Sequence, residues 1–340
     1  MRFALIFAAA LLGWTIAGAP ARADAPPVLR IGWVVVPSDL APLMFTKPGL
    51  APHAGKTYTP RLIHFTGTSS ILTALANGSL DCAALAYSTF ALGIENAGMS
   101  DLRVIADSFQ DGVPGYHTNS FYANDNSAIH TIEDLKGKVL ATNEVGSAID
   151  MALRAMLAQH GLKDKRDLTI VEVPFPSQIA MLQQGKVDLI SAVAPFGFDP
   201  RLNSIGFPLF SQSQAIGRTQ MIMRVARAGF LKSHHAMMVD FMEDYLHTLH
   251  YLSDPAHHDE AVALIAKATK QPASLYASWV FTKSDYYRDP NALPDLGALQ
   301  ANVDMQQRLG FLKAHIDVTK YADLSLAREA AQRLGAQAKQ

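Results

Sequence analysis

Two short segments rich in glycine and hydroxyl side chains contain the residues that could bind a small anion. They are Gly67-Thr68-Ser69-Ser70 and Gly146-Ser147. Each segment opens a predicted helix, over residues 70–77 and 147–160, so unpaired backbone N–H groups and the positive end of the helix dipole lie beside the hydroxyls. Such a site accepts an anion without any lysine or arginine. The alternative is ordinary N-capping, which Thr68, Ser69 and Ser147 would also perform.

Further candidates for a ligand site lie in loops that follow predicted strands, where open α/β sheets bind their ligands. Four aromatic side chains would form apolar walls, although each could instead belong to the core. These are Trp33, Tyr87, Tyr116 and Phe196. The other candidates would supply polar or backbone contacts, and they are Pro37, Ser38, Ser88, His117 and Pro195.

Other kinds of chemistry find little support in the sequence. His247 and His250 share one face of a predicted helix, but no cysteine or carboxylate at a fixed spacing completes a metal site. The chain contains no G-x-S-x-G element, no P-loop and no dinucleotide fingerprint. Cys82, the only cysteine, lies among small apolar residues and is expected to be buried and inert. We therefore expect no metal, no cofactor and no enzymatic activity.

The elements that must position these residues alternate between strand and helix, which predicts an α/β architecture with mainly parallel sheets. Apolar runs predict strands at 29–36, 60–65, 104–106, 120–123, 139–142, 168–173, 189–193 and 220–225. Helical patterns without a comparable strand follow at 230–252, 259–270 and 294–309. A helical C-terminal segment of this length must pack on another body, and the first lobe is the expected platform.

An internal repeat indicates that the fold consists of two similar lobes. The order helix, Asn77-Gly78-Ser79-Leu80-Asp81, strand recurs in the second half as helix, Gln184-Gly185-Lys186-Val187-Asp188, strand. We predict lobe 1 at residues 28–118 together with 222–340, and lobe 2 at residues 119–221. The segments 119–123 and 220–225 would then cross between the lobes and form a hinge.

The N-terminus predicts export. Arg2, an apolar run that reaches Ile16, and Ala21-Arg22-Ala23 follow one another as in a secretory signal peptide of residues 1–23, cleaved near Ala23. The chain is 49% hydrophobic and 17% charged, which is typical of a globular protein. Its net charge of −1 argues against a nucleic-acid partner. The expected location is the periplasm.

Four motifs, in this order along the chain, resemble the nitrate/sulfonate/taurine-type periplasmic substrate-binding proteins, which are related to binders of thiamine precursors. They are Phe65-Thr66-Gly67-Thr68-Ser69-Ser70-Ile71, Ala74-Leu75-Ala76-Asn77-Gly78-Ser79-Leu80-Asp81, Glu133-Asp134-Leu135-Lys136-Gly137-Lys138 and Met181-Leu182-Gln183-Gln184-Gly185-Lys186-Val187-Asp188. Ala194-Pro195-Phe196 is similar to the small-Pro loop of that family. The resemblance covers roughly residues 29–227.

The resemblance implies the type II periplasmic-binding-protein fold, with two α/β lobes joined by two crossover strands and a helical C-terminal segment. It places the ligand loops at residues 34–38, 67–70, 87–88, 146–147 and 195–196. The implied function is that of the solute-binding component of an ABC importer, in which hinge closure traps a small organic anion. The expected partners are this ligand and an ABC permease of the inner membrane, and the protein is expected to be a monomer.

Two alternatives stay open at this point. The first is an exported enzyme on the same fold, similar to the thiamine-pyrimidine synthases, although their cysteine-rich motif is missing because Cys82 stands alone. The second is a sensor that presents the ligand to a membrane receptor without a role in transport.

Overall fold

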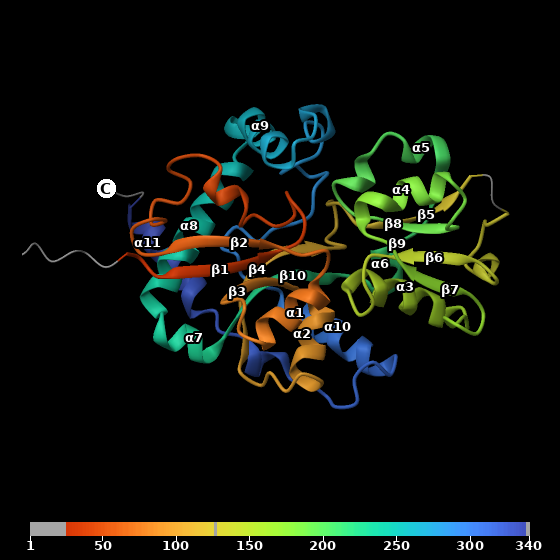
Figure 1. The fold of residues 1–340 in the computed structure, drawn as a ribbon, viewed down its shortest axis with the longest axis horizontal. Helices are drawn as coiled ribbons and strands as arrows, with labels where there is room; N and C mark the ends of the chain where they lie inside the picture. The colour runs from red at the N-terminus through yellow and green to blue at the C-terminus, as the bar shows by residue number, and fades with distance from the viewer. Residues whose placement is uncertain (1–24, 126–127, 338–340) are drawn as a thin grey trace, which may run out of the picture.

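The computed structural model describes residues 25–125 and 128–337, and it contains two α/β lobes that lie side by side (Figure 1). Each lobe has a five-stranded sheet with helices on both faces. The predicted signal peptide, residues 1–23, lies outside the described residues. Within the described part of the chain, no helix is long and apolar enough to cross a membrane.

Lobe 1 is built on a sheet with the strand order β2-β1-β3-β10-β4. Its strands are β1 (Val28–Trp33), β2 (Thr59–His64), β3 (Cys82–Ala86), β4 (Leu102–Asp111) and β10 (Thr219–Arg227). β1 runs parallel to β2 and β3, whereas β10 runs antiparallel to β3 and β4. The sheet is therefore mixed, because the last strand returns from the other lobe.

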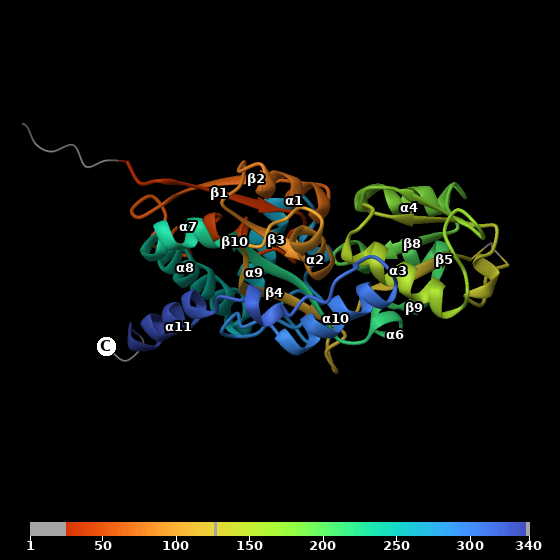
Figure 2. The same cartoon turned by 90° about the horizontal axis from the view of Figure 1, so that it is seen from below.

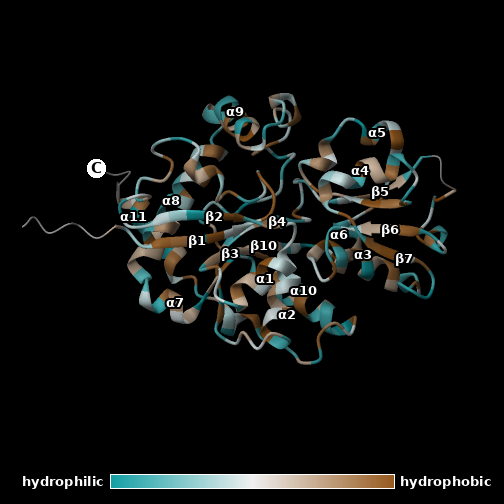
Figure 3. Ribbon diagram, in the orientation of Figure 1, coloured by the Kyte–Doolittle hydropathy of each residue, from teal (hydrophilic) through white to brown (hydrophobic). Residues whose placement is uncertain are grey.

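Lobe 2 repeats this plan with the strand order β7-β6-β8-β5-β9. Its strands are β5 (Ser120–Asn124), β6 (Val139–Thr142), β7 (Thr169–Glu172), β8 (Leu189–Ala192) and β9 (Gly206–Ser211). β6 pairs in parallel with β7 and β8, and β5 pairs antiparallel with β8 and β9. Hydrophobic residues concentrate in these central strands in both lobes (Figure 3).

The repeated aspartate has the same structural role in each lobe. The Asp81 carboxylate accepts a hydrogen bond of 2.8 Å from the backbone N–H of Arg30 in β1. In lobe 2 the Asp188 carboxylate accepts one of 2.9 Å from the backbone N–H of Val139 in β6. Each aspartate thus holds the neighbouring parallel strand through one backbone N–H, which gives the repeated motif the same role in both lobes.

The helices cover both sheets. In lobe 1 they are α1 (Thr68–Ala76), α2 (Tyr87–Glu95), α7 (Ala228–Ser233), α8 (His235–Ser253), α9 (His258–Thr269), α10 (Leu296–Arg308) and α11 (Ser325–Gln337). In lobe 2 they are α3 (Ala148–Gln159), α4 (Phe175–Gln183), α5 (Leu202–Ile205) and α6 (Gln212–Ile216). The C-terminal helices pack on lobe 1, as expected: α11 lies along α8, and α10 contacts α2 and β10 (Figure 2).

The chain crosses between the sheets just outside the predicted segments. It leaves lobe 1 after β4 and returns after α6, so the connections are residues 112–119 and 217–218. The predicted crossing segments form most of β5 and β10 instead, and each of these strands pairs within a single sheet. The predicted boundary at 221/222 falls inside β10, because the pairing of this strand with β4 already begins at Thr219.

Candidate ligand-binding site

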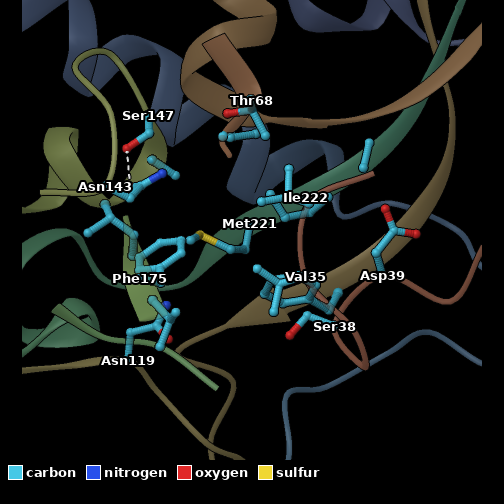
Figure 4. Close-up of a pocket in the computed structure, with 18 of the residues that line it drawn as sticks. Val35, Ser38, Asp39, Thr68, Asn119, Asn143, Ser147, Phe175, Met221 and Ile222 are labelled. Carbon is cyan, nitrogen blue, oxygen red and sulfur yellow. Dashed lines mark hydrogen bonds between the residues drawn. The ribbon is translucent and has the colours of Figure 1, made fainter. Parts of the chain in front are cut away.

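A pocket lies between the two lobes and is lined by residues from both (Figure 4). Its empty space is about 580 Å³, including the mouth that opens to solvent. Most of the wall is apolar, with Phe109 and Ile222 from lobe 1 and Phe175 and Val193 from lobe 2. The space suits a compact ligand with an apolar body.

Polar residues line this pocket in the turn after β1, at the start of α1 and in the loop before α3, and Asn119 and Tyr286 line it as well. Ser38 and Asp39 follow β1 in a turn that is fixed by a hydrogen bond of 2.7 Å from the Asp39 N–H to the carbonyl of Val35. Thr68 is the first residue of α1, and Asn143 and Ser147 belong to the loop between β6 and α3. Each of these loops follows the carboxyl end of a strand, where ligands of such sheets bind.

Four of the predicted site residues line this pocket: Ser38, Gly67, Thr68 and Ser147. They come from both lobes, with Thr68 at the start of α1 and Ser147 directed towards Asn143 on the other side of the space (Figure 4). The hydroxyl oxygen of Thr68 is buried and has no hydrogen-bond partner in the described structure. The Ser147 hydroxyl is occupied, since it donates to Asn143 at 2.9 Å and accepts from the N–H of Asp150.

Tyr87 and Ser88 were predicted to lie in a loop, but they form the first turn of α2. Both are fully buried and neither lines the pocket. The Tyr87 hydroxyl donates to the carbonyl of Ala148 in lobe 2 at 3.4 Å. Burial raises the pKa of Tyr87 well above its ordinary value. This side chain therefore joins the lobes, rather than forming a wall of the site.

The other aromatic candidates lie outside the pocket lining. Trp33 packs against His64, with ring centroids 4.5 Å apart, and Phe196 packs against Phe175. Tyr116 accepts a hydrogen bond of 2.8 Å from Lys283 in a separate hollow of lobe 1.

His117 is packed between Phe198 and Tyr286, with ring centroids 4.8 and 5.1 Å away. Burial lowers its pKa to about 4, although the nearby Asp285 opposes the shift. His117 is therefore neutral at pH 7, and its Nε2 has no partner in the described structure.

The remaining candidates do not line the pocket themselves but lie next to residues that do. Pro37 and Pro195 follow cis peptide bonds, and the residues beside them, Ser38 and Ala194, line the space. Ser70 bonds to the carbonyl of Gly67 at 3.1 Å. Ser69 lies at the junction of the lobes, where its hydroxyl bonds to Val145, and a Cβ at Gly146 would lie 3.6 Å from the Ser69 hydroxyl oxygen.

The N-terminus of α1, where an anion was predicted, is occupied by a carboxylate of the protein itself. Glu144 of lobe 2 accepts hydrogen bonds from the backbone N–H groups of Ser69 at 2.9 Å and Ser70 at 3.2 Å. The Ser69 hydroxyl donates to the carbonyl of Val145 at 3.0 Å. These are N-capping interactions made across the lobe junction, worth about 1 kcal/mol.

The N-terminus of α3 is capped as well. The N–H of Gly146, whose φ of 80° favours glycine, donates to the Asp150 carboxylate at 2.9 Å. The N–H of Val145 donates to Glu172 at 2.6 Å. Ser147 caps α3, as the capping alternative expected, whereas neither Thr68 nor Ser69 caps α1, where Glu144 takes that role. In this conformation the N–H groups bound by Glu144, Asp150 and Glu172 are not available to a ligand.

Tyr286 joins the lobes at the floor of the pocket. Its hydroxyl donates to the Asn119 side chain at 2.5 Å and accepts from the N–H of Ala194 in lobe 2 at 3.0 Å. Nearby, Phe198 of lobe 2 stacks on Trp279 of lobe 1, with ring centroids 4.3 Å apart and the planes inclined by 3°. The C-terminal segment thus contributes directly to the contact between the lobes.

A buried ion pair supports the turn that follows β1. The Oδ1 atom of Asp39 accepts hydrogen bonds from the Arg224 guanidinium of β10 and from the N–H of Ala41. Burial lowers the pKa of Arg224, which is fully shielded from solvent. Asp39 is among the residues that line the pocket, whereas Arg224 is not.

The sequence did not single out Asp39, Asn143 or Tyr286 as site residues. Asn143 directly follows β6 and Asp39 lies in the turn after β1, so the rule that placed ligand loops after strands could have included them. Tyr286 lies in an irregular segment more than 50 residues beyond β10, and no local pattern marks it.

Metal chemistry gains no candidate at this site. His247 and His250 bond to the carbonyls of Leu50 and Pro290 rather than to each other. In the part of the chain that the structure describes, ligand atoms of His53, Asp240 and Glu243 come within 4.8 Å of one another. Arg333 pairs with this Asp240 at 2.9 Å, which supplies the positive charge that a cation would otherwise bring.

Known proteins share both a family model and the fold with this chain. A family model described as the NMT1-like family matches residues 22–266. The alkanesulfonate-binding protein from Xanthomonas axonopodis pv. citri has a TM-score of 0.69 and 18% identity, covering 89% of this chain and 100% of that one. The periplasmic nitrate-binding protein from Synechocystis PCC 6803 has a TM-score of 0.69 and 16% identity, covering 92% and 90%.

A desulfurization enzyme is also similar, with a TM-score of 0.62 and 12% identity, covering 91% of this chain and 99% of that one. No curated protein matches the sequence. At these identities the solved structures establish the fold, and they confirm the expected type II periplasmic-binding architecture.

Proposed function

Because this chain belongs to the NMT1-like family, we propose that it is the periplasmic substrate-binding component of an ABC importer. The observation that supports this function is the pocket, to which the turn after β1 and the loop before α3 contribute from opposite lobes. A ligand that contacts both walls favours the conformation in which the lobes touch. The sulfonate- and nitrate-binding proteins of similar fold are consistent with such a role.

In this proposal the protein is exported, acts as a monomer and delivers its ligand to an inner-membrane permease. The ligand is a small organic molecule whose body packs against the apolar wall. The predicted anionic group lacks a free docking point in this conformation, because Glu144 and Asp150 already cap α1 and α3.

An enzymatic role is the main alternative, since one similar structure is an enzyme. Cys82, the only cysteine of the chain, is fully buried in β3 and does not line the pocket. Burial raises the pKa of its thiol to about 12, so it is protonated at neutral pH. These features favour binding over thiol chemistry.

The experiment is a thermal-shift screen of the mature protein with carboxylates, sulfonates, nitrate, amines, alcohols and thiamine precursors. A ligand at about 100 times its Kd stabilises the protein by about 2.7 kcal/mol. Any hit is then incubated with the protein and recovered for mass spectrometry. Unchanged recovery supports the binding role, conversion to a product supports the enzyme, and a panel without any hit contradicts the proposal.

Transport and sensing are separated by the membrane partner. Co-purification of the ligand-bound protein with a permease and an ATPase supports transport. Co-purification with a receptor that lacks an ATPase contradicts it.

A further inference from the structure

We propose that the ligand of this pocket carries a polar atom at each end of an apolar body. One end is an acceptor that receives a hydrogen bond from the amide nitrogen of Asn143, and the other is a hydroxyl or similar group that bonds to the Ser38 hydroxyl. This inference rests on the proposed function as a small-molecule receptor. It goes beyond that function by naming two specificity-determining side chains and the pattern of polar groups that they select.

Most polar side chains that line the pocket, in the part of the chain that the structure describes, have no free atom to offer to a ligand. The Thr68 hydroxyl and Oδ2 of Asp39 are enclosed by the protein, and Oδ1 of Asp39 is held in its ion pair. The side chains of Asn119, Ser147 and Tyr286 already have hydrogen-bond partners within the protein. These five side chains are therefore either satisfied or out of reach of a ligand.

Asn143 of lobe 2 is the first exception. It is 8% exposed, and its Oδ1 atom accepts a hydrogen bond of 2.9 Å from the Ser147 hydroxyl. Its Nδ2 atom has no acceptor among the described residues, although it is not enclosed. A Cβ at Gly67 would lie 3.0 Å from this nitrogen, so Nδ2 lies beside a pocket residue of lobe 1. Because an amide nitrogen can only donate, the group that satisfies it is a hydrogen-bond acceptor of the ligand.

Ser38 of lobe 1 is the second exception. It is 7% exposed, and its hydroxyl has no hydrogen-bond partner among the described residues and is not enclosed. The turn that carries it is fixed, because the N–H of Asp39 donates to the carbonyl of Val35 at 2.7 Å. The hydroxyl therefore has a defined position at the pocket, where it can both donate to a ligand and accept from it.

Asn143 and Ser38 lie on opposite sides of the pocket (Figure 4). The apolar side chain of Met221 lies between them in this view, and Phe175 and Val35 add to the apolar wall. A molecule that satisfies both free groups thus has polar atoms at its two ends and an apolar middle. It also contacts both lobes, so its binding favours the conformation in which the lobes touch.

The test uses four probes that share a para-disubstituted benzene ring and differ only at the two ends. The probe para-(hydroxymethyl)acetophenone carries both polar ends. The probe para-methylacetophenone lacks the hydroxyl, para-ethylbenzyl alcohol lacks the carbonyl oxygen, and para-ethyltoluene lacks both. Melting temperature and calorimetric affinity are measured for the wild-type protein with each probe. We expect the probe with both ends to bind most tightly, and the loss of either end to weaken binding about tenfold.

Ser38→Ala and Asn143→Asp then test each contact by itself. Ser38→Ala should remove the advantage of the probe hydroxyl and keep that of the carbonyl. Asn143→Asp replaces the donor nitrogen with an oxygen but keeps an acceptor for Ser147, so it should remove the advantage of the carbonyl and keep that of the hydroxyl. Ratios of affinity within one variant cancel any general change in binding. Ser88→Ala is the matched control and should keep both advantages, because the Ser88 hydroxyl also lacks a partner in the described structure but is buried outside the pocket.

The outcomes separate this inference from the proposed function. If the four probes bind the wild-type protein equally, or if both advantages persist in the two variants, the inference is overturned and the receptor function stands. If a variant does not fold, the comparison of the four probes on the wild-type protein still decides. If only a member of the wider panel binds, an affinity that is unchanged in Ser38→Ala and Asn143→Asp overturns the inference. If no compound binds at all, the receptor function itself fails.

Discussion

The carboxylate of Glu144 in lobe 2 accepts a hydrogen bond of 2.9 Å from the backbone N–H of Ser69 in lobe 1. A second one of 3.2 Å comes from Ser70. The carboxylate belongs to the loop after β6 and the N–H groups belong to α1, so the contact requires the lobes to be together. Glu144 is therefore a lock on this conformation as well as a helix cap.

Glu144→Ala should release this lock. Removing a cap costs about 1 kcal/mol, and this loss falls on the conformation with touching lobes. We expect the ligand-free variant to have a larger radius of gyration in small-angle X-ray scattering, and ligands to bind about fivefold more weakly. Glu144→Gln is the control, because its amide oxygen can still accept one hydrogen bond. Equal scattering curves for the wild-type and Ala proteins would exclude the lock.

Gly67→Ala should disturb the same contact from the other side. The backbone of Gly67 is extended, with φ of −169°, so alanine introduces no backbone strain. Its Cβ, however, would lie 2.2 Å from Oε2 of Glu144. We expect the lobes to separate while each lobe stays folded, as seen by increased proteolysis or scattering with unchanged circular dichroism. Gly229→Ala, where a Cβ meets no atom within 4 Å, should behave like the wild-type protein.

The alternation of strand and helix and the repeated Gly-x-aliphatic-Asp motif were enough to predict two similar lobes. They were informative because Asp81 and Asp188 have a local role, each holding the adjacent strand through one backbone N–H. Elements without a strong pattern were missed. β9 contains Pro208 and lies at the edge of its sheet, and α2 begins directly at Tyr87, where the preceding strand made a loop seem natural.

The chemistry of the site was harder to predict than its location. Thr68 and Ser147 line the pocket from opposite lobes, but whether the N-termini of α1 and α3 are free depends on Glu144 and Asp150. A capping residue from the other lobe, 75 positions away in the sequence, leaves no local trace. The pairing of Asp39 with Arg224 is similarly non-local, since it depends on the return of β10 to the first sheet.

Tyr286→Phe should weaken the contact between the lobes. The change leaves the N–H of Ala194 without its acceptor in a buried position, which costs about 1–3 kcal/mol. We expect lower ligand affinity in calorimetry together with a lower melting temperature. Tyr276→Phe is the matched control, because the Tyr276 hydroxyl bonds to Thr269 at 2.9 Å within lobe 1. A similar loss of affinity in both variants would show that the effect is not specific to the lobe junction.

His117→Phe should change how stability depends on pH. In the folded protein burial lowers the pKa of His117 to about 4, whereas in the unfolded chain it stays near 6.5. Between these values only the unfolded chain takes up the proton, so the wild-type protein loses stability as the pH falls from 6.5 towards 4. At pH 5 this loss is up to about 2 kcal/mol, and phenylalanine removes it.

The free energy of unfolding in urea is measured for the wild-type protein and the His117→Phe variant at pH 7 and at pH 5. The readout is how the difference between the two proteins changes with pH. Burial raises the pKa of Asp107 and of Asp111 to about 7, and these groups act in the opposite direction. They are present in both proteins, so their contribution cancels in the difference. His117→Gln should show the same pH trend at a lower free energy of unfolding, since glutamine also does not titrate but loses the ring contact with Phe198. A stability difference that is independent of pH would mean that His117 is not held neutral by its burial.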